Sequence, residues 1–117
     1  MPTNVLIVDD HPGFRASARR LLSSHGYEIV GEASSADEAL AAAYLLKPEV
    51  VLLDVGLPDA DGFEVARQMS EFHPDARVVL VSSRDREEVE PLLDGAGVRG
   101  FIPKAELSAG ALRDLLD

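Results

Sequence analysis

The chain has 117 residues, a formal net charge of −10 and no cysteine. This length predicts one domain over residues 1–117, with a core that needs no disulfide bonds. The 21 acidic residues outnumber the 11 basic ones, which argues against direct binding to nucleic acid or to an anionic membrane surface. The lack of cysteine excludes thiolate catalysis and fits a cytoplasmic location. We find no basic signal-peptide segment and no apolar run of about 18 residues, the length of a membrane span.

The first half of the chain alternates between short apolar runs and helical patterns. Residues 5–8 form a β-branched apolar run that predicts a buried strand, and Pro12 can open the helix that Gly26 ends. A second strand is predicted over 27–33. The residues 35–38 (SADE) read as a capping box for a helix that extends to about residue 46.

The second half repeats the alternation. Three strands are predicted, over residues 50–53, 78–81 and 98–102, and helices over 63–72, from 85 onward, and over 108–116. Pro91 falls inside the helical pattern that begins at Asp85. Since an interior proline costs about 3 kcal/mol relative to alanine, we expect this helix to be short, kinked, or to begin after Asp85.

Five apolar strands in alternation with five helices predict an α/β fold. Buried apolar strands favour a parallel sheet with helices on both faces, and right-handed crossovers with one reversal of winding make it doubly wound. The leading topology is the flavodoxin-like (βα)5 arrangement with strand order 2-1-3-4-5.

Polar side chains follow four of the predicted strands. Asp9 and Asp10 follow the first strand, Asp54 the third, Ser82 the fourth and Lys104 the fifth. Because ligands bind outside the carboxyl ends of parallel strands, we expect these groups to meet at one edge of the sheet. Three carboxylates that close together repel one another unless a cation lies between them, and oxygen ligands favour Mg²⁺.

A magnesium site beside a free carboxylate, an ammonium group and a hydroxyl suits phosphoryl transfer, which depends mainly on positioning and charge neutralisation. In this hypothesis Asp54 is the nucleophile and forms an aspartyl-phosphate. Mg²⁺ and Lys104 neutralise the phosphoryl oxygens, and Ser82 donates a hydrogen bond to one of them.

With these positions in order, the chain resembles a response-regulator receiver domain of two-component signalling over essentially its full length. The acceptor loop 53–64 (LDVGLPDADGFE) and the segment 97–104 (GVRGFIPK) are similar to the signatures of that family. The stretch 8–15 (VDDHPGFR) resembles the branch whose receivers usually precede a helix-turn-helix effector domain. The predicted domain leaves no room for such an effector, so an output on DNA would need another domain or another protein.

The resemblance implies further roles. Asp10 and Asp54 would bind Mg²⁺ directly, with the backbone carbonyl of Gly56, and Asp9 would act mainly through water. Ser82 and Phe101 would form the switch that changes the surface made by the fourth helix, the fifth strand and the fifth helix. A histidine kinase or phosphotransfer protein would be the donor, and phosphorylation can produce a homodimer. Such a domain is not a conventional enzyme, since it catalyses only its own phosphorylation and dephosphorylation.

Simpler interpretations stay open for each position. The Asp9–Asp10 pair can cap a helix, Asp54 can be a turn residue, and Lys104 can be a solvated loop side chain. Ser82 can satisfy its loop, and Phe101 faces the core in either interpretation. The three histidines, His11, His25 and His73, lack metal-ligand spacing and are interpreted as non-catalytic, although His11 flanks the site.

Three other functions compete with the phosphorylation switch. A haloacid-dehalogenase-like phosphatase needs a second Asp two residues after its nucleophile, but His11 and Pro12 stand at those places. A flavodoxin-like mononucleotide site needs a hydroxyl- and glycine-rich loop after the first strand, where Asp9 and Asp10 would repel a phosphate. A pseudo-receiver that binds partners without phosphorylation is the remaining alternative, and the intact set of Asp10, Asp54, Ser82 and Lys104 argues against it.

Overall fold

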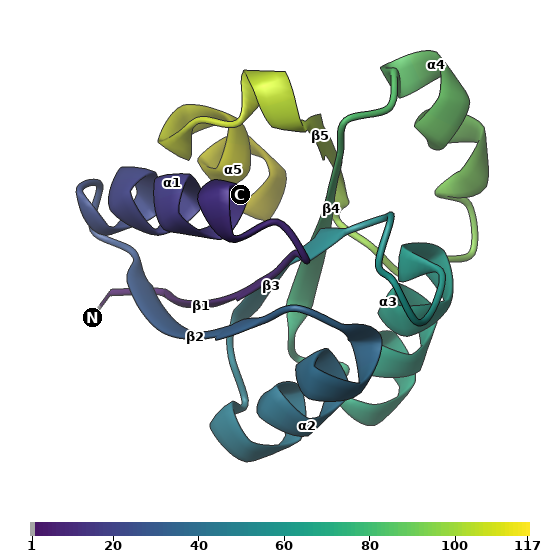
Figure 1. Ribbon diagram of the computed structural model, residues 1–117, viewed down its shortest axis with the longest axis horizontal. Coiled ribbons are helices and arrows are strands. Elements are labelled where there is room, and N and C mark those ends of the chain that lie inside the picture. The colour runs from purple at the N-terminus through teal and green to yellow at the C-terminus, as the bar shows by residue number, and fades with distance from the viewer. Residues whose placement is uncertain (1) are drawn as a thin grey trace.

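The structure, a computed structural model, describes residues 2–117. It contains one five-stranded parallel sheet with the order β2-β1-β3-β4-β5, as the sequence predicts (Figure 1). The strands are β1 (Asn4–Val8), β2 (Glu28–Ala33), β3 (Val50–Asp54), β4 (Arg77–Ser82) and β5 (Gly100–Pro103). The strands that carry the predicted site residues, β1, β3, β4 and β5, are therefore consecutive in the sheet.

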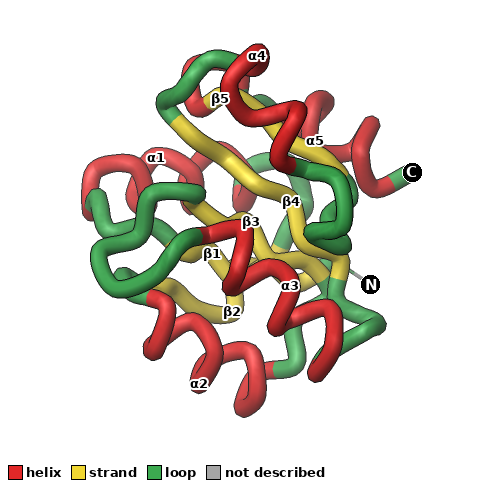
Figure 2. Tube along the Cα trace, turned by 90° about the vertical axis from the view of Figure 1, so that its right-hand side faces the viewer, coloured by secondary structure: helices red, strands yellow, loops and turns green. Residues whose placement is uncertain are grey.

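Helices cover both faces of this sheet. They are α1 (Pro12–Ser23), α2 (Ala36–Leu46), α3 (Gly62–Phe72), α4 (Arg86–Val89) and α5 (Ala109–Leu116), with 3₁₀ segments η1 (Glu90–Leu92) and η2 (Lys104–Glu106). Helices α1 and α5 pack on one face, and α2, α3 and α4 pack on the other, the face seen in Figure 2. This two-sided arrangement makes the fold doubly wound.

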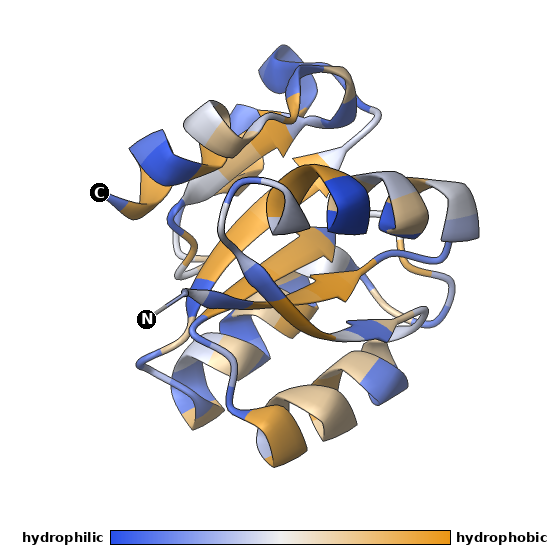
Figure 3. Cartoon of the chain, turned by 90° about the vertical axis from the view of Figure 1, so that its left-hand side faces the viewer, coloured by the Kyte–Doolittle hydropathy of each residue, from blue (hydrophilic) through white to orange (hydrophobic). Residues whose placement is uncertain are grey.

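The core consists of two layers because successive strand residues point to opposite faces. Along β1, Val5 and Ile7 pack with α1 and α5, whereas Leu6 and Val8 pack with α2 and α3. All residues of β3 are buried, and the inner strands of the sheet are strongly apolar (Figure 3), whereas the edge strand β2 carries two glutamates. Burial on both faces explains why these strands read as continuous apolar runs rather than as alternating ones.

Two side chains cap the start of α2. The Ser35 hydroxyl accepts a hydrogen bond from the Glu38 backbone N–H at 3.2 Å, half of the predicted capping box. The Glu38 carboxylate accepts from Ser34 instead of closing the box on Ser35. Asp59 adds a second cap from the acceptor loop, since its carboxylate accepts from the Ala36 N–H at 2.7 Å. The loop after β3 is thereby tied to the start of α2.

The segment between β4 and β5 differs most from a regular crossover. Helix α4 has only four residues and passes directly into η1, which contains Pro91. This confirms the prediction of a short helix. Strand β5 begins at Gly100, two residues later than the predicted start at residue 98, because its pairing with β4 begins only at Gly100, opposite Val79. The chain turns at Gly97, where φ is +71°, just before the strand. Within residues 2–117, no helix is long and apolar enough to cross a bilayer.

Candidate functional site

An acidic cluster lies at the carboxyl end of the sheet, where β1 and β3 end side by side. One potential ligand atom from each of Asp9, Asp10, His11 and Asp54 lies within 4.8 Å of the other three. Asp9 is fully buried, Asp54 is 4% exposed, and the Asp10 side chain is 34% exposed. The three carboxylates that the sequence predicts to converge are thus close together, and most of their charge is shielded from water.

Lys104 joins this cluster from the start of η2, directly after β5. Its Nζ lies 2.6 Å from Asp9 Oδ2 and 3.6 Å from Asp54 Oδ2. The ammonium group also lies 4.6 Å from the centre of the Phe14 ring on α1, a favourable cation–π distance. With the side chain only 17% exposed, Lys104 is held against the carboxylates and is not a solvated loop residue.

The electrostatic environment disfavours the charged form of Asp54. Burial is the main cause that raises the pKa of this carboxyl above its ordinary value of 3.8, and the negative charge of Asp9 raises it further. Lys104 and the hydrogen bond from the Gly56 N–H act in the opposite direction. The positive charge of Lys104 and the Gly56 N–H therefore offset part of the effect that burial has on the pKa of Asp54.

Ser82 and Phe101 lie beside the cluster rather than in it. The buried Ser82 hydroxyl, at the end of β4, accepts a hydrogen bond from the Arg84 N–H at 3.0 Å, so it stabilises its loop while keeping a proton to donate. Phe101 is buried in the core layer under α2, α3 and α4, and the Arg86 guanidinium lies 6.0 Å from its ring centre. Both positions fit the simpler interpretations, and their switch roles stay predictions.

The acceptor loop is held by a close backbone contact. The Gly62 N–H donates to the Val55 carbonyl at 2.9 Å, and Gly56 pairs with Asp61 in an isolated antiparallel bridge. A Cβ at Gly62 would lie 2.6 Å from the Asp54 carbonyl oxygen and 2.6 Å from the Val55 Cα. The first turn of α3 thus packs directly on the backbone of Asp54, and only glycine leaves room for it.

The donor set fits a hard divalent cation. Asp9 Oδ2 and Asp10 Oδ1 are buried oxygens without a hydrogen bond in the described part of the chain, although Lys104 lies close to the first of them. Carboxylate oxygens that lack donors are the ligands that Mg²⁺ takes, one or two at a time, while it keeps several waters. Asp9, Asp10 and Asp54 bring such carboxylate oxygens together. Gly56 is exposed two residues after Asp54, and its role as a carbonyl ligand stays a prediction.

Three contributors to the site were not recognised from the sequence. His11 was interpreted as non-catalytic, but its Nδ1 lies 2.9 Å from Asp9 Oδ1 and 3.2 Å from Asp10 Oδ1. Arg15 on α1 donates to the Asp9 carbonyl at 2.5 Å and pairs with Glu32 on β2. Phe14, under Lys104, is the third. No spacing rule links these residues to the cluster, although the position of His11 beside two aspartates was a usable signal.

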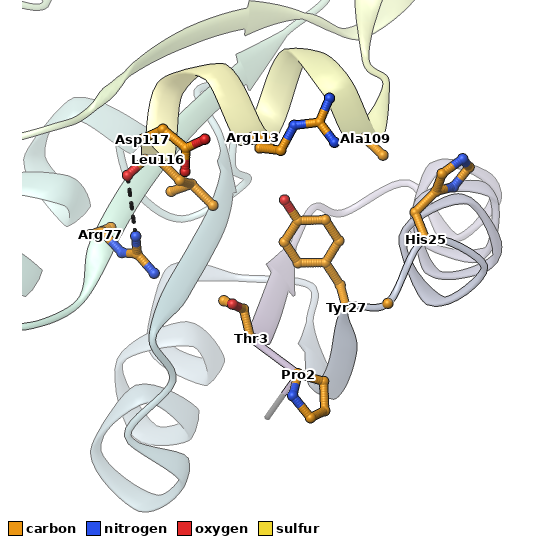
Figure 4. A pocket seen from close by; sticks show the side chains of 10 residues that line it. Pro2, Thr3, His25, Tyr27, Arg77, Ala109, Arg113, Leu116 and Asp117 are labelled. Carbon is orange, nitrogen blue, oxygen red and sulfur yellow. Dashed lines mark hydrogen bonds between the residues drawn. The ribbon is translucent and has the colours of Figure 1, made fainter.

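A pocket of about 340 Å³ lies at the other end of the sheet, away from the acidic cluster (Figure 4). Tyr27, Arg77 and Arg113 line it, and Arg77 donates to the Leu116 carbonyl at 3.3 Å. The pocket holds none of the predicted site residues. The chemistry therefore concentrates at the carboxyl end, as expected for a doubly wound sheet.

Comparison with known proteins agrees with this geometry. The family model of the response regulator receiver domain matches residues 5–117. The response regulator GacA from Pseudomonas syringae pv. syringae is 41% identical over 101 residues, which are 86% of this chain and 47% of GacA. The chain spans about half the length of the first curated relatives that it matches.

Two solved structures show the same likeness in three dimensions. The signal receiver domain of NarL from Mycobacterium tuberculosis has a TM-score of 0.86 and 32% identity, covering 98% of this chain and 97% of that one. The CheX–CheY–BeF3–Mg²⁺ complex from Borrelia burgdorferi matches with a TM-score of 0.84 and 28% identity, covering 99% of this chain and 87% of that one.

Proposed function

The chain belongs to the receiver domain family of two-component response regulators, and from this premise we propose that it is a phosphorylation switch with Asp54 as the phosphoryl acceptor. The observation that carries the proposal is the placement of Lys104. Its ammonium group bridges Asp9 and Asp54, which are 45 residues apart, at 2.6 Å and 3.6 Å. Such an arrangement supplies positive charge where a phosphoryl group on Asp54 would bring more negative charge.

The proposed reaction is a transfer between two side chains. A carboxylate oxygen of Asp54 forms a bond to the phosphorus of a phosphohistidine, the phosphorus–nitrogen bond breaks, and the donor imidazole recovers the electron pair and takes up a proton. Hydrolysis later returns the Asp54 carboxylate and inorganic phosphate. The Lys104 ammonium group then pairs with the phosphoryl oxygens, and the Ser82 hydroxyl donates a hydrogen bond to one of them.

The acidic residues prepare Asp54 for this role. Asp10 and Asp54 would hold Mg²⁺ with the Gly56 carbonyl, while Asp9 would act mainly through water and Lys104. When bound, Mg²⁺ supplies positive charge to the attacking and transferred oxygens. One structural relative is a complex that contains Mg²⁺, which supports the choice of this ion.

The donor in this proposal is a histidine kinase or a phosphotransfer protein, and the output surface consists of α4, β5 and α5. Phosphorylation would move Ser82 and Phe101 and change that surface for a downstream protein. Because the chain spans about half of its curated relatives, an effector such as a DNA-binding domain would lie outside residues 1–117. A cytoplasmic location and a homodimer on phosphorylation stay predictions.

Intact-mass spectrometry tests the transfer directly. The protein is incubated with Mg²⁺ and acetyl phosphate, and one added phosphoryl group is expected. Asp54→Asn should abolish the added mass because it removes the nucleophile, whereas the matched variant Asp75→Asn changes an exposed aspartate and should react like wild type. An adduct that survives in Asp54→Asn contradicts the assignment. No adduct with any donor would favour the phosphorylation-independent alternative.

Thermal unfolding tests the cation separately. Mg²⁺ should raise the melting temperature of the wild-type protein, since a ligand that binds only the folded state stabilises it. Asp10→Ala should reduce this rise because it removes one proposed ligand. Equal rises in wild type and Asp10→Ala would contradict the role of Asp10 while leaving Asp54 as the acceptor.

A further inference from the structure

His11 precedes the first residue of α1, but its side chain does not cap that helix. It occupies the N-cap position, and its side chain makes no capping hydrogen bond. The next residue, Pro12, has no backbone N–H and fits the first helical position, so the helix needs little from this ring. The imidazole is 66% exposed, which means that core packing does not fix it either.

The ring is instead directed at the two carboxylates of the site. The backbone N–H of His11 donates to Asp9 Oδ1 at 2.8 Å, and this turn brings the imidazole back over the acidic pair. Nδ1 then lies 2.9 Å from Asp9 Oδ1 and 3.2 Å from Asp10 Oδ1. Two donors that each bind one cation at about 2.1 Å are about 3 Å apart when they occupy neighbouring coordination positions. The 3.2 Å separation from Asp10 Oδ1 therefore matches neighbouring ligands of a single ion. The 2.9 Å contact with Asp9 Oδ1 is a hydrogen bond that orients the ring toward the site.

Lys104 does not compete for the same oxygen. Its ammonium group lies against Asp9 Oδ2, whereas the imidazole lies against Asp9 Oδ1. The distance between Lys104 Nζ and His11 Nδ1 is 3.5 Å. The lysine thus lies against one oxygen of the Asp9 carboxylate, and the imidazole lies against the other.

From these contacts we propose that His11 is a nitrogen ligand of the cation site, which therefore takes borderline divalent ions such as Ni²⁺ and Co²⁺ more tightly than an all-oxygen receiver site would. Imidazole suits such ions, while carboxylates and water suit Mg²⁺, and affinities for nitrogen and oxygen donors rise along the series from Mn²⁺ to Cu²⁺. The inference rests on the proposed function in one respect, the cation held by Asp10 and Asp54. If this holds in the cell, the occupancy of the cation site responds to the supply of transition metals as well as to that of Mg²⁺.

Isothermal titration calorimetry with MgCl2 and, separately, NiCl2 tests this inference on protein that carries no polyhistidine tag. The variants are His11→Ala and His11→Asn, since Asn preserves a hydrogen-bond donor but is a poor ligand for Ni²⁺. The matched control is His25→Ala, which removes another exposed histidine, outside the site. We expect both His11 variants to lower Ni²⁺ affinity about tenfold or more, to change Mg²⁺ affinity less than about threefold, and His25→Ala to change neither.

The visible absorption of bound Co²⁺ gives a second measurement that does not depend on phosphorylation. Loss of the nitrogen ligand should shift the bands in His11→Asn relative to wild type. Equal Ni²⁺ affinities and identical Co²⁺ spectra in wild type and both His11 variants, with Mg²⁺ binding intact, would overturn the inference and leave the proposed function standing. Equal loss of Ni²⁺ binding in His25→Ala would also overturn it. Absence of Mg²⁺ binding to the wild-type protein would instead remove the cation site of the proposed function, and this inference with it.

Discussion

Helices α3 and α4 make the same kind of connection between neighbouring parallel strands on the same face of the sheet, yet they are built very differently. Helix α3 has 11 residues, four of them buried, and the Asp61 carboxylate caps its start by accepting from the Phe63 N–H at 2.9 Å. Helix α4 has four residues, of which only Val89 is buried, and Asp85 makes no capping hydrogen bond. Helix α3, which supports the acceptor loop, is therefore fixed by burial and by a cap. Helix α4 has only one buried side chain and no capping hydrogen bond.

This difference indicates which segment of the chain would change conformation when Asp54 is phosphorylated. A segment with few buried apolar contacts opens at low free energy, and switching elements are drawn from such segments. In the proposed function, the response should therefore concentrate between β4 and β5 and spare α3.

The largest expected effect is on hydrogen exchange after phosphorylation. With Mg²⁺ and acetyl phosphate, exchange should change in residues 84–98 and stay nearly constant in residues 62–72, because the first segment is weakly held. Asp54→Asn should remove the change completely. Hydrogen-exchange mass spectrometry measures both segments in one experiment. Equal changes in the two segments would show that α3 responds as freely as α4.

Matched truncations of one buried valine in each helix come next. Val65 in α3 and Val89 in α4 are 1% and 0% exposed, so burial alone predicts equal losses. We expect Val65→Ala to lower the free energy of unfolding by about 2 kcal/mol, a cavity cost in a rigid surround. Val89→Ala should cost less than half of that, since α4 can relax. Urea denaturation measures both, and equal losses would contradict the comparison.

The charge of Asp54 gives a smaller effect that depends on pH. Because the folded-state pKa of this carboxyl is raised by burial, wild-type stability falls as the pH rises from 3.8 through the raised value. Without metal, Asp54→Asn should match wild type below that window and exceed its stability at pH 7. Denaturant titrations across the pH range measure the difference. A constant difference at all pH values would mean that the charge is not the cause.

The smallest effect on stability is expected for Pro91→Ala. The proline stands in the first turn of η1, a position that it tolerates, so the change in the free energy of unfolding should stay within about 1 kcal/mol. Alanine should nevertheless let α4 continue through η1, because the backbone N–H is restored. Circular dichroism would record the added helix, and an unchanged spectrum would show that Pro91 does not limit α4.

The strands and their order could be predicted because buried parallel strands are continuous apolar runs whose carboxyl ends must meet. The same rule predicted the meeting of Asp9, Asp54 and Lys104. The predicted start of β5 was wrong by two residues, since pairing with β4, and not apolar content, decides where the strand begins. A left-handed turn at Gly97 precedes the strand. A turn of this kind has only a weak signal in an isolated glycine.

The partners within the site could not be predicted for a different reason. Phe14 and Lys104 are 90 residues apart, and their contact depends on how α1 and η2 pack. His11 was adjacent to the acidic pair in sequence, but whether its ring turns toward the carboxylates or away from them depends on one backbone turn. Sequence patterns specify which elements meet, and side-chain directions at loop ends are settled by local geometry.

Gly62 has a consequence for how this protein can vary. Any side chain there would press on the backbone of Asp54, since even a Cβ would lie 2.6 Å from its carbonyl oxygen. A mutational scan should therefore find the position as intolerant as Asp54 itself, although it takes no part in the chemistry. In the proposed function, selection on phosphoryl transfer would thus extend to a helix residue whose only contribution is the space it leaves empty.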